Sequence, residues 1–78
     1  MDQNAQTEIK AHLMQTSEKF RQLMDQHHQY DLQVEALEAK HALSAQEELE
    51  EHRLKKLKLH LKDEMEQMVS EYKLQHAG

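Results

Sequence analysis

The apolar residues in the first half of the chain follow one seam, with alternating steps of four and three residues. The seam contains Ile9, Leu13, Thr16, Phe20, Leu23, His27, Tyr30, Val34, Leu37 and His41. A repeat of about 3.5 residues is typical of an α-helix that buries one stripe against a neighbouring helix. Its polar members, Thr16, His27 and His41, weaken the seam without changing the spacing. The pattern predicts one long helix over about residues 5–41.

Beyond His41, the same spacing no longer falls on apolar residues. Its next six positions are all polar: Ser44, Glu48, Glu51, Lys55, Lys58 and Lys62. A new apolar stripe recurs instead about every 3.6 residues, as in a straight α-helix. It contains Leu54, Leu57, Leu61, Met65, Met68 and Tyr72. The reset predicts a turn at residues 42–45 and a second helix over about residues 45–75.

Ser44 and Glu47 have the spacing of a capping box, in which each side chain bonds to a backbone N–H at the start of a helix. The rival interpretation is one uninterrupted helix of about 70 residues, about 105 Å long. Neither Gly nor Pro lies near residue 43 to break it. The register reset and the cap favour a hairpin. A short connection makes the two helices antiparallel neighbours.

Composition agrees with this fold class. The chain has no Pro and no Cys, and its single Gly is residue 78. Turn-rich β folds need Gly and Pro at their corners, so an all-α fold is predicted. We expect a single domain, residues 1–78, folded as an antiparallel two-helix hairpin. The predicted helix–helix core comprises Leu13, Phe20, Leu23, His27, Tyr30, Val34, Leu37, Leu54, Leu57, Leu61, Met65, Met68 and Tyr72.

Some large apolar residues lie off both stripes. They are Leu32, Leu49, Leu59 and Leu74. A domain of this size obtains only about 3–5 kcal/mol from its own core. We therefore expect a homodimer that forms a four-helix bundle. An unidentified protein partner is the other candidate to cover the spare apolar surface.

Lys55, Lys58 and Lys62 form a basic ridge beside the second stripe, in a chain of net charge −5. Glu51 lies four residues before Lys55 and Glu66 four after Lys62, so ion pairs along the helix are available. The favoured interpretation is a solvated flank with internal charge pairing. The alternative is a docking ridge, which would suit a nucleic-acid- or ribosome-associated factor. That alternative is less favoured, because the aromatic residues lie on buried stripes and not on stacking platforms.

The sequence offers little for catalysis or metal binding. No two histidines lie three or four residues apart. The one Glu-x-x-His pair, Glu38 and His41, falls near the predicted tip, whereas di-metal bundles use two such motifs in mid-bundle. The chain lacks thiols, a Gly-rich phosphate loop and a nucleophile elbow. We expect no enzyme activity, no metal and no cofactor.

His27 occupies a seam position in the middle of the first predicted helix. The favoured interpretation is an amphipathic side chain packed in the core, with its nitrogen satisfied by a neighbour. A sharper hypothesis is that protonation of a buried His27 loosens the hairpin below about pH 6, where imidazole titrates.

Targeting signals are not visible in the sequence. Residues 1–13 have neither the basic start nor the apolar segment of a secretory signal. Apolar runs never exceed three residues, whereas a membrane span needs about 20. We expect a cytoplasmic protein with no membrane-spanning segment.

Two stretches have a familiar combination of residues: FRQLMDQHHQYDLQVEALE (20–38) and LKKLKLHLKDEMEQM (54–68). Together they resemble the YdcH-like proteins, a small bacterial family of unknown function, over about residues 13–72. The resemblance implies a helix-loop-helix hairpin. The family pattern has a leucine where this chain has Tyr30. No activity or ligand is established for that family, so the resemblance implies a fold and no mechanism.

Overall fold

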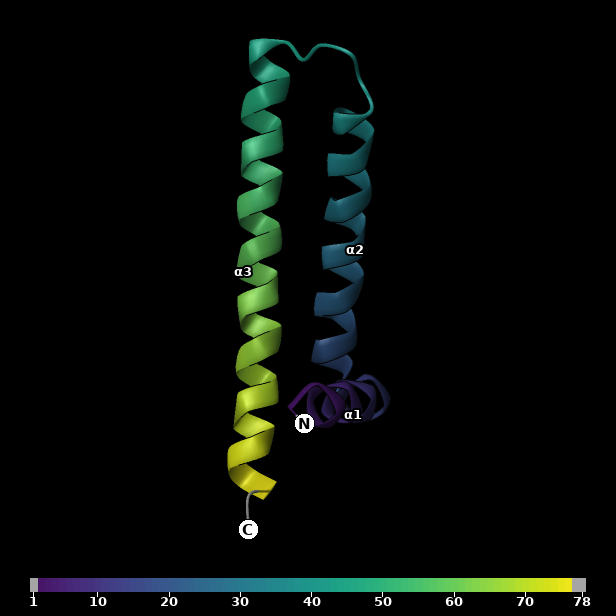
Figure 1. The fold of residues 1–78 in the computed structure, drawn as a ribbon, viewed down its shortest axis with the longest axis vertical. Helices are drawn as coiled ribbons and strands as arrows, with labels where there is room; N and C mark the ends of the chain where they lie inside the picture. The colour runs from purple at the N-terminus through teal and green to yellow at the C-terminus, as the bar shows by residue number, and fades with distance from the viewer. Residues whose placement is uncertain (1, 77–78) are drawn as a thin grey trace.

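The computed structural model describes residues 2–76, which are helical except at two connections. The helices are α1 (Asp2–Thr16), α2 (Glu18–Glu38) and α3 (Ala45–His76). α2 and α3 run antiparallel and side by side (Figure 1). α1 crosses them at the end of the hairpin opposite the connecting loop, which we call the base (Figure 1).

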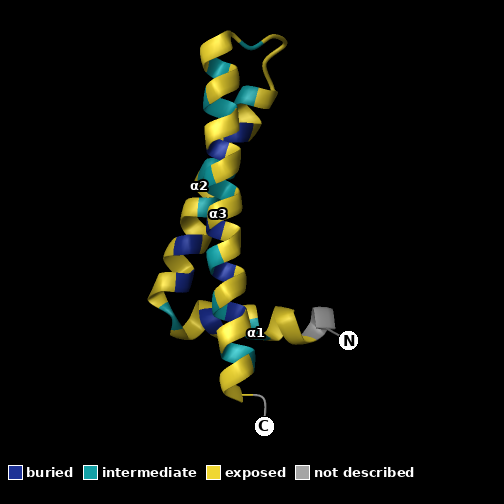
Figure 2. Ribbon diagram, turned by 90° about the vertical axis from the view of Figure 1, so that its left-hand side faces the viewer, coloured by how far each residue is buried: buried dark blue, intermediate teal, exposed yellow. Residues whose placement is uncertain are grey.

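Two buried zones hold the helices together. The base holds an apolar cluster to which all three helices contribute: Leu13, Phe20, Leu23, Leu61, Met65 and Val69. Nearer the loop, Val34 of α2 and Leu54 of α3 are buried. The buried segments of α2 and α3 follow their line of contact, and those at the base lie beside α1 (Figure 2). None of the buried residues in the described part of the chain is polar or charged.

The predicted continuous helix over residues 5–41 is wrong, because the chain bends at Ser17 and forms α1 and α2 separately. Ser17 has an extended backbone, with φ −117° and ψ 113°, and its Oγ accepts a hydrogen bond from the Phe20 N–H. That hydrogen bond caps the start of α2. At the end of α1, Arg21 Nη1 donates to the carbonyl oxygen of Met14 at 3.0 Å.

The bend has a physical reason in the stagger of α2 against α3. The Asp31–Lys58 ion pair marks that stagger. Leu13 lies 18 residues before Asp31, and His76 lies 18 residues after Lys58. In a straight helix, Leu13 would therefore lie level with His76, seven residues beyond Val69 of the basal cluster. Bending at Ser17 brings Leu13 into the basal cluster instead.

The second connection lies close to the predicted turn but begins earlier. α2 ends at Glu38 and α3 begins at Ala45, so His41 lies in the loop and not in a helix. The Ala39 N–H donates to the Glu35 carbonyl oxygen at the end of α2. The rival prediction of one uninterrupted helix of about 70 residues is therefore wrong.

The residues predicted for the helix–helix core occupy two levels of burial. Seven are buried: Leu13, Phe20, Leu23, Val34, Leu54, Leu61 and Met65. Six are partly covered: His27, Tyr30, Leu37, Leu57, Met68 and Tyr72. The prediction missed Val69, which is only 4% exposed. Its position four residues after Met65 was the available signal, because residues four apart share a helix face.

Candidate functional site

The hairpin of α2 and α3 has two long edges of different chemistry. At about 3.6 residues per turn, the helical positions separate into two sets. One edge, the charged flank, comprises Asp31, Glu38, Lys55, Lys58 and Lys62. The opposite edge, the apolar flank, comprises Tyr30, Leu37, Leu57 and Met68. These two flanks border the buried line of contact between α2 and α3, whereas Leu32, Leu49 and Leu74 are exposed away from it.

On the charged flank, acidic residues of α2 contact the lysines of α3. Lys58 Nζ lies 2.5 Å from Asp31 Oδ1. The hydrogen bond that Lys58 donates is the main reason that the pKa of Asp31 is lowered from its usual value. Lys55 Nζ lies 3.6 Å from Glu38 Oε2 and 3.7 Å from Glu51 Oε1. Two of the three lysines in the predicted docking ridge are therefore paired within the chain.

Lys62 differs from the other two ridge lysines. Within residues 2–76, no carboxylate forms an ion pair with Lys62, so the predicted pairing with Glu66 is not seen. Lys62 lines an open depression together with His27, Lys55, Lys58 and Leu59. The ridge thus offers one unpaired ammonium group rather than a row of three.

His27 lies on the edge of this depression and is only partly covered. The hypothesis of a pH switch required a buried imidazole, and the structure does not bury it. The nearby charges are the carboxylate of Asp31 on its own helix and the lysines of the charged flank on α3. His27 therefore belongs to the charged flank and does not lie inside the core.

The apolar flank has half-covered side chains on both helices and no ion pair between them. Tyr30 and Leu37 of α2 and Leu57 and Met68 of α3 are all partly exposed. Near the loop, this flank has a shallow hollow whose lining is mainly apolar. The hollow is lined by Gln33, Ala36, Leu37, Lys40, Glu50 and Leu54. A hollow of this kind suits an apolar side chain from another helix.

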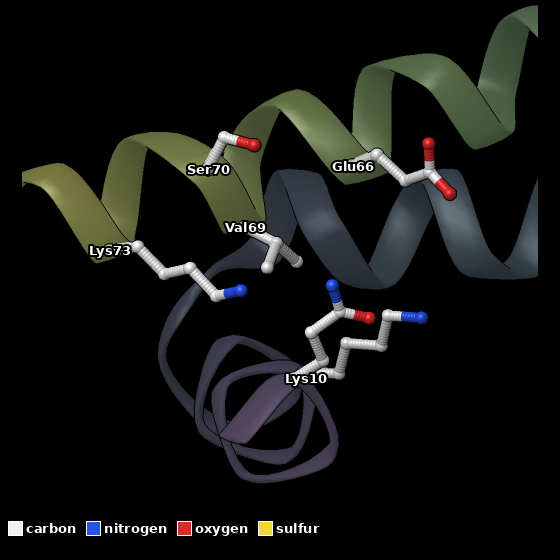
Figure 3. Close-up of a pocket in the computed structure, with 6 residues that line it drawn as sticks. Lys10, Glu66, Val69, Ser70 and Lys73 are labelled. Carbon is white, nitrogen blue, oxygen red and sulfur yellow. The ribbon is translucent and has the colours of Figure 1, made fainter. Parts of the chain in front are cut away.

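A notch between α1 and α3 forms a third feature (Figure 3). It has a volume of about 200 Å³ and is lined by Gln6, Lys10, Glu66, Val69, Ser70 and Lys73. Lys73 extends from α3 toward α1, while Glu66 projects from the same helix farther along it (Figure 3). The notch is open to solvent where α1 and α3 separate, so α1 covers the base only in part.

The predicted cap of α3 is formed by reciprocal hydrogen bonds. The Ser44 N–H donates to Glu47 Oε1 at 3.0 Å, and the Glu47 N–H donates to Ser44 Oγ at 3.1 Å. Lys40 in the loop forms an ion pair with Glu47. The hydrogen bonds from Lys40 and from the Ser44 backbone lower the pKa of Glu47 to about 2. These contacts fix the end of the loop at the start of α3.

Groups suited to metal binding do not come together in the described residues. No cluster of three His, Cys, Asp or Glu side chains there could hold a metal ion. Glu38 Oε2 faces Lys55, and His41 lies in the loop, so the Glu-x-x-His pair does not share a helix face.

A family model described as "Protein of unknown function (DUF465)" matches residues 20–69, more than half of the chain. The chain belongs to the DUF465 family. The YdcH-like proteins are this same family, so the resemblance seen in the sequence is confirmed. The DUF465 match begins at Phe20, after the bend at Ser17, and ends at Val69. It covers most of α2 and α3 and does not include α1.

No curated protein and no solved structure shows a significant match to the chain. Among residues 2–76, no helix combines the length and the apolar character that crossing a membrane requires.

Proposed function

We propose that this DUF465 protein is a non-catalytic helical interaction module that associates with a second copy through its apolar flank. The observation that carries the proposal is the contrast between the two flanks. The charges of the charged flank are largely balanced by ion pairs within the chain, whereas Tyr30, Leu37, Leu57 and Met68 remain partly exposed on the other edge. Burying exposed apolar area stabilises a complex by about 25 cal/mol per Å².

The exposed area of the chain supports this proposal. The molecule measures 52 × 23 × 17 Å and exposes 6145 Å². A compact monomer of the same 9.3 kDa mass would expose about 5,000 Å². The difference of about 1,100 Å² exceeds the area of about 800 Å² that each partner buries in a standard interface. A dimer through the long flank would bring the exposed area per chain to that of a compact protein.

The pairing of Lys55 with Glu38 and of Lys58 with Asp31 argues against the alternative of a nucleic-acid- or ribosome-associated factor. Phosphate binding needs lysines whose charge is free to replace the counterions of the nucleic acid. A cytoplasmic location, expected from the sequence, is part of the proposal, and cell fractionation tests it.

The experiment compares two leucines of α3 that lie on different faces. Leu57 belongs to the apolar flank, whereas Leu59 is 59% exposed and lines the depression on the charged flank. Light scattering coupled to size exclusion measures the mass of the wild type, of Leu57→Ser and of Leu59→Ser at several concentrations. We expect a wild-type mass twice that of the monomer, a shift to monomer in Leu57→Ser and no shift in Leu59→Ser.

A wild type that stays folded and monomeric at every concentration contradicts the proposal. A dimer that survives Leu57→Ser contradicts the choice of the apolar flank. Far-UV circular dichroism of each variant establishes that the helices are retained.

A further inference from the structure

α1 packs against the base of the hairpin, and this contact buries α1 only in part. Leu13 packs in the basal cluster with Phe20, Met65 and Val69, and Tyr72 packs against that cluster. The His12 and Tyr72 rings lie with their centroids 5.1 Å apart. We call Phe20, Met65, Val69 and Tyr72 the seat of α1. One side of the contact between α1 and α3 remains open as the notch in Figure 3.

The link between α1 and α2 is a single residue whose sequence also suits a straight helix. Only Ser17 departs from helical structure, and neither Gly nor Pro enforces the bend. In the bent form, the carbonyl oxygens of Met14 and Gln15 accept hydrogen bonds from Arg21 Nη1. In a straight helix, the same two oxygens would accept from backbone N–H groups four residues later. Both forms therefore satisfy these carbonyls.

The apolar seam favours the straight form, and the basal cluster opposes it within one chain. Ile9 and Leu13 continue the heptad spacing of Phe20 and Leu23 through the bend. Because a straight helix would place Leu13 level with His76, Ile9 and Leu13 would leave the basal cluster of their own chain. The straight form also leaves the seat empty. If a second copy is also straight, its α1 can bind the empty seat of the first copy. Ile9 and Leu13 of each copy are then buried against the other copy.

We infer that α1 is an exchangeable helix: the seat of one copy binds the α1 of a second copy, and α1 and α2 of each chain then form one continuous helix. The exchanged contacts are those that the bent chain already makes at its base. The inference goes beyond the proposed function, since exchange at the base needs no contact along the apolar flank. It also fits the DUF465 match, which starts at Phe20 and leaves α1 outside the shared hairpin.

Two substitutions at Ser17 should shift the equilibrium between the bent and the straight form in opposite directions. Ser17→Ala removes the cap of α2 and favours the straight helix, which we expect to shift each link about fivefold toward the straight form. An exchanged dimer contains two such links, so its formation constant should rise about twenty-five-fold. Ser17→Gly keeps the bend, because glycine is tolerated at a cap and disfavoured inside a helix. Ser44→Ala is the matched control, since it removes the other cap and leaves the link unchanged.

The chain has no cysteine, so single cysteines can report which α1 lies in which seat. Gln6 and Ser70 are exposed residues that line the same notch from α1 and α3. Chains carrying Gln6→Cys alone and chains carrying Ser70→Cys alone are unfolded together, refolded as a mixture and oxidised. A disulfide-linked pair joining the two kinds of chain forms efficiently only when α1 of one copy lies on α3 of the other. Gln6→Cys mixed with Leu49→Cys, near the loop, measures random collisions.

We expect linked Gln6→Cys and Ser70→Cys chains above the collision level. We further expect their yield to increase with Ser17→Ala, to decrease with Ser17→Gly and to stay unchanged with Ser44→Ala. A yield at the collision level in the Ser17→Ala background overturns exchange. To separate the two proposals, the mass of Leu57→Ser is also measured together with Ser17→Gly, which disfavours exchange. A dimer that survives both substitutions contradicts the apolar flank, and a dimer without linked Gln6→Cys and Ser70→Cys chains contradicts exchange.

Discussion

Lys58 Nζ lies 2.5 Å from Asp31 Oδ1, an ion pair between residues 27 positions apart in the chain. This contact joins α2 to α3 and engages the central lysine of the basic ridge. The charge of Lys58 is therefore balanced within the chain.

Removing the Asp31 charge should lower stability in a salt-dependent way. Asp31→Asn keeps the size of the side chain and removes the charge that Lys58 contacts. We expect a lower melting temperature in about 0.01 M salt and little difference in about 1 M salt, where the Debye length falls to about 3 Å. Asp63→Asn is the control, because Asp63 is exposed and forms no ion pair within residues 2–76. Equal effects of both substitutions at low salt would refute this role of the pair.

Leu54 should be one of the most sensitive positions in the chain. It is 1% exposed and lies away from the basal cluster, so its replacement leaves a cavity beside Val34 that no other helix can fill. Leu54→Ala should cost about 3 kcal/mol, close to the about 3–5 kcal/mol available to a domain of this size. We expect urea titrations followed by circular dichroism to show a marginally stable chain that unfolds at much lower urea concentration than the wild type. Leu49→Ala, at a residue 70% exposed, should change stability by less than about 0.5 kcal/mol; a similar loss there would contradict the assignment.

The loop and α3 could be predicted from the sequence because their signals are local. Six polar residues in succession on the old seam exclude burial, and Ser44 with Glu47 marks the new helix start within four residues. The structure places α3 at Ala45–His76, within one residue of the predicted bounds. The end of α2 was less well predicted, since the polar His41 matched the seam only by its spacing.

The bend at Ser17 could not be predicted from the seam, because its main cause is not local. The seam runs through Thr16 and Phe20 without a change of step. The reason to bend is the packing of Leu13 with Met65 and Val69, about fifty residues away along the chain, which helical spacing does not encode. A local signal existed in Ser17 followed by Glu18, a cap residue before an acidic first turn.

On the charged flank too, a contact within one helix could be predicted from the sequence, whereas one contact between helices could not. The Glu51–Lys55 pair follows from the i,i+4 rule and is present at 3.7 Å. The contact of Asp31 with Lys58 follows from folding the chain back near residue 43, which brings the two helices side by side. The contact of Lys55 with Glu38 depends on the stagger of two helices and on rotamers, so the sequence did not indicate it. Homodimerisation stays a prediction.

Freeing the ridge lysines should strengthen binding to polyanions. The double substitution Asp31→Asn with Glu38→Gln removes both carboxylates that α2 supplies to the charged flank. We expect stronger retention on heparin and tighter binding of single-stranded RNA, each falling steeply as salt is raised.

The control for this experiment is Glu64→Gln with Glu71→Gln, which changes the net charge equally on the opposite side of α3. Both residues line a shallow pocket with Met68 of the apolar flank. Equal retention of the two double variants would show that net charge, and not the ridge, governs binding.

Glu47 should make the stability of the hairpin depend on pH in the acid range. Hydrogen bonds from Lys40 and from the Ser44 N–H lower the pKa of Glu47 from 4.5 to about 2. Because the pKa is lower in the folded state, ionised Glu47 stabilises the fold above about pH 4.5, and this contribution is lost as the pH falls toward 2. Glu47→Gln should therefore lower the free energy of unfolding at pH 7 and flatten its decline between pH 4.5 and 2, measured by urea titration at each pH. Glu66→Gln, which removes a carboxylate with no ion pair in the described residues, should keep the wild-type decline, and an unchanged decline in Glu47→Gln would show that the loop contact contributes nothing.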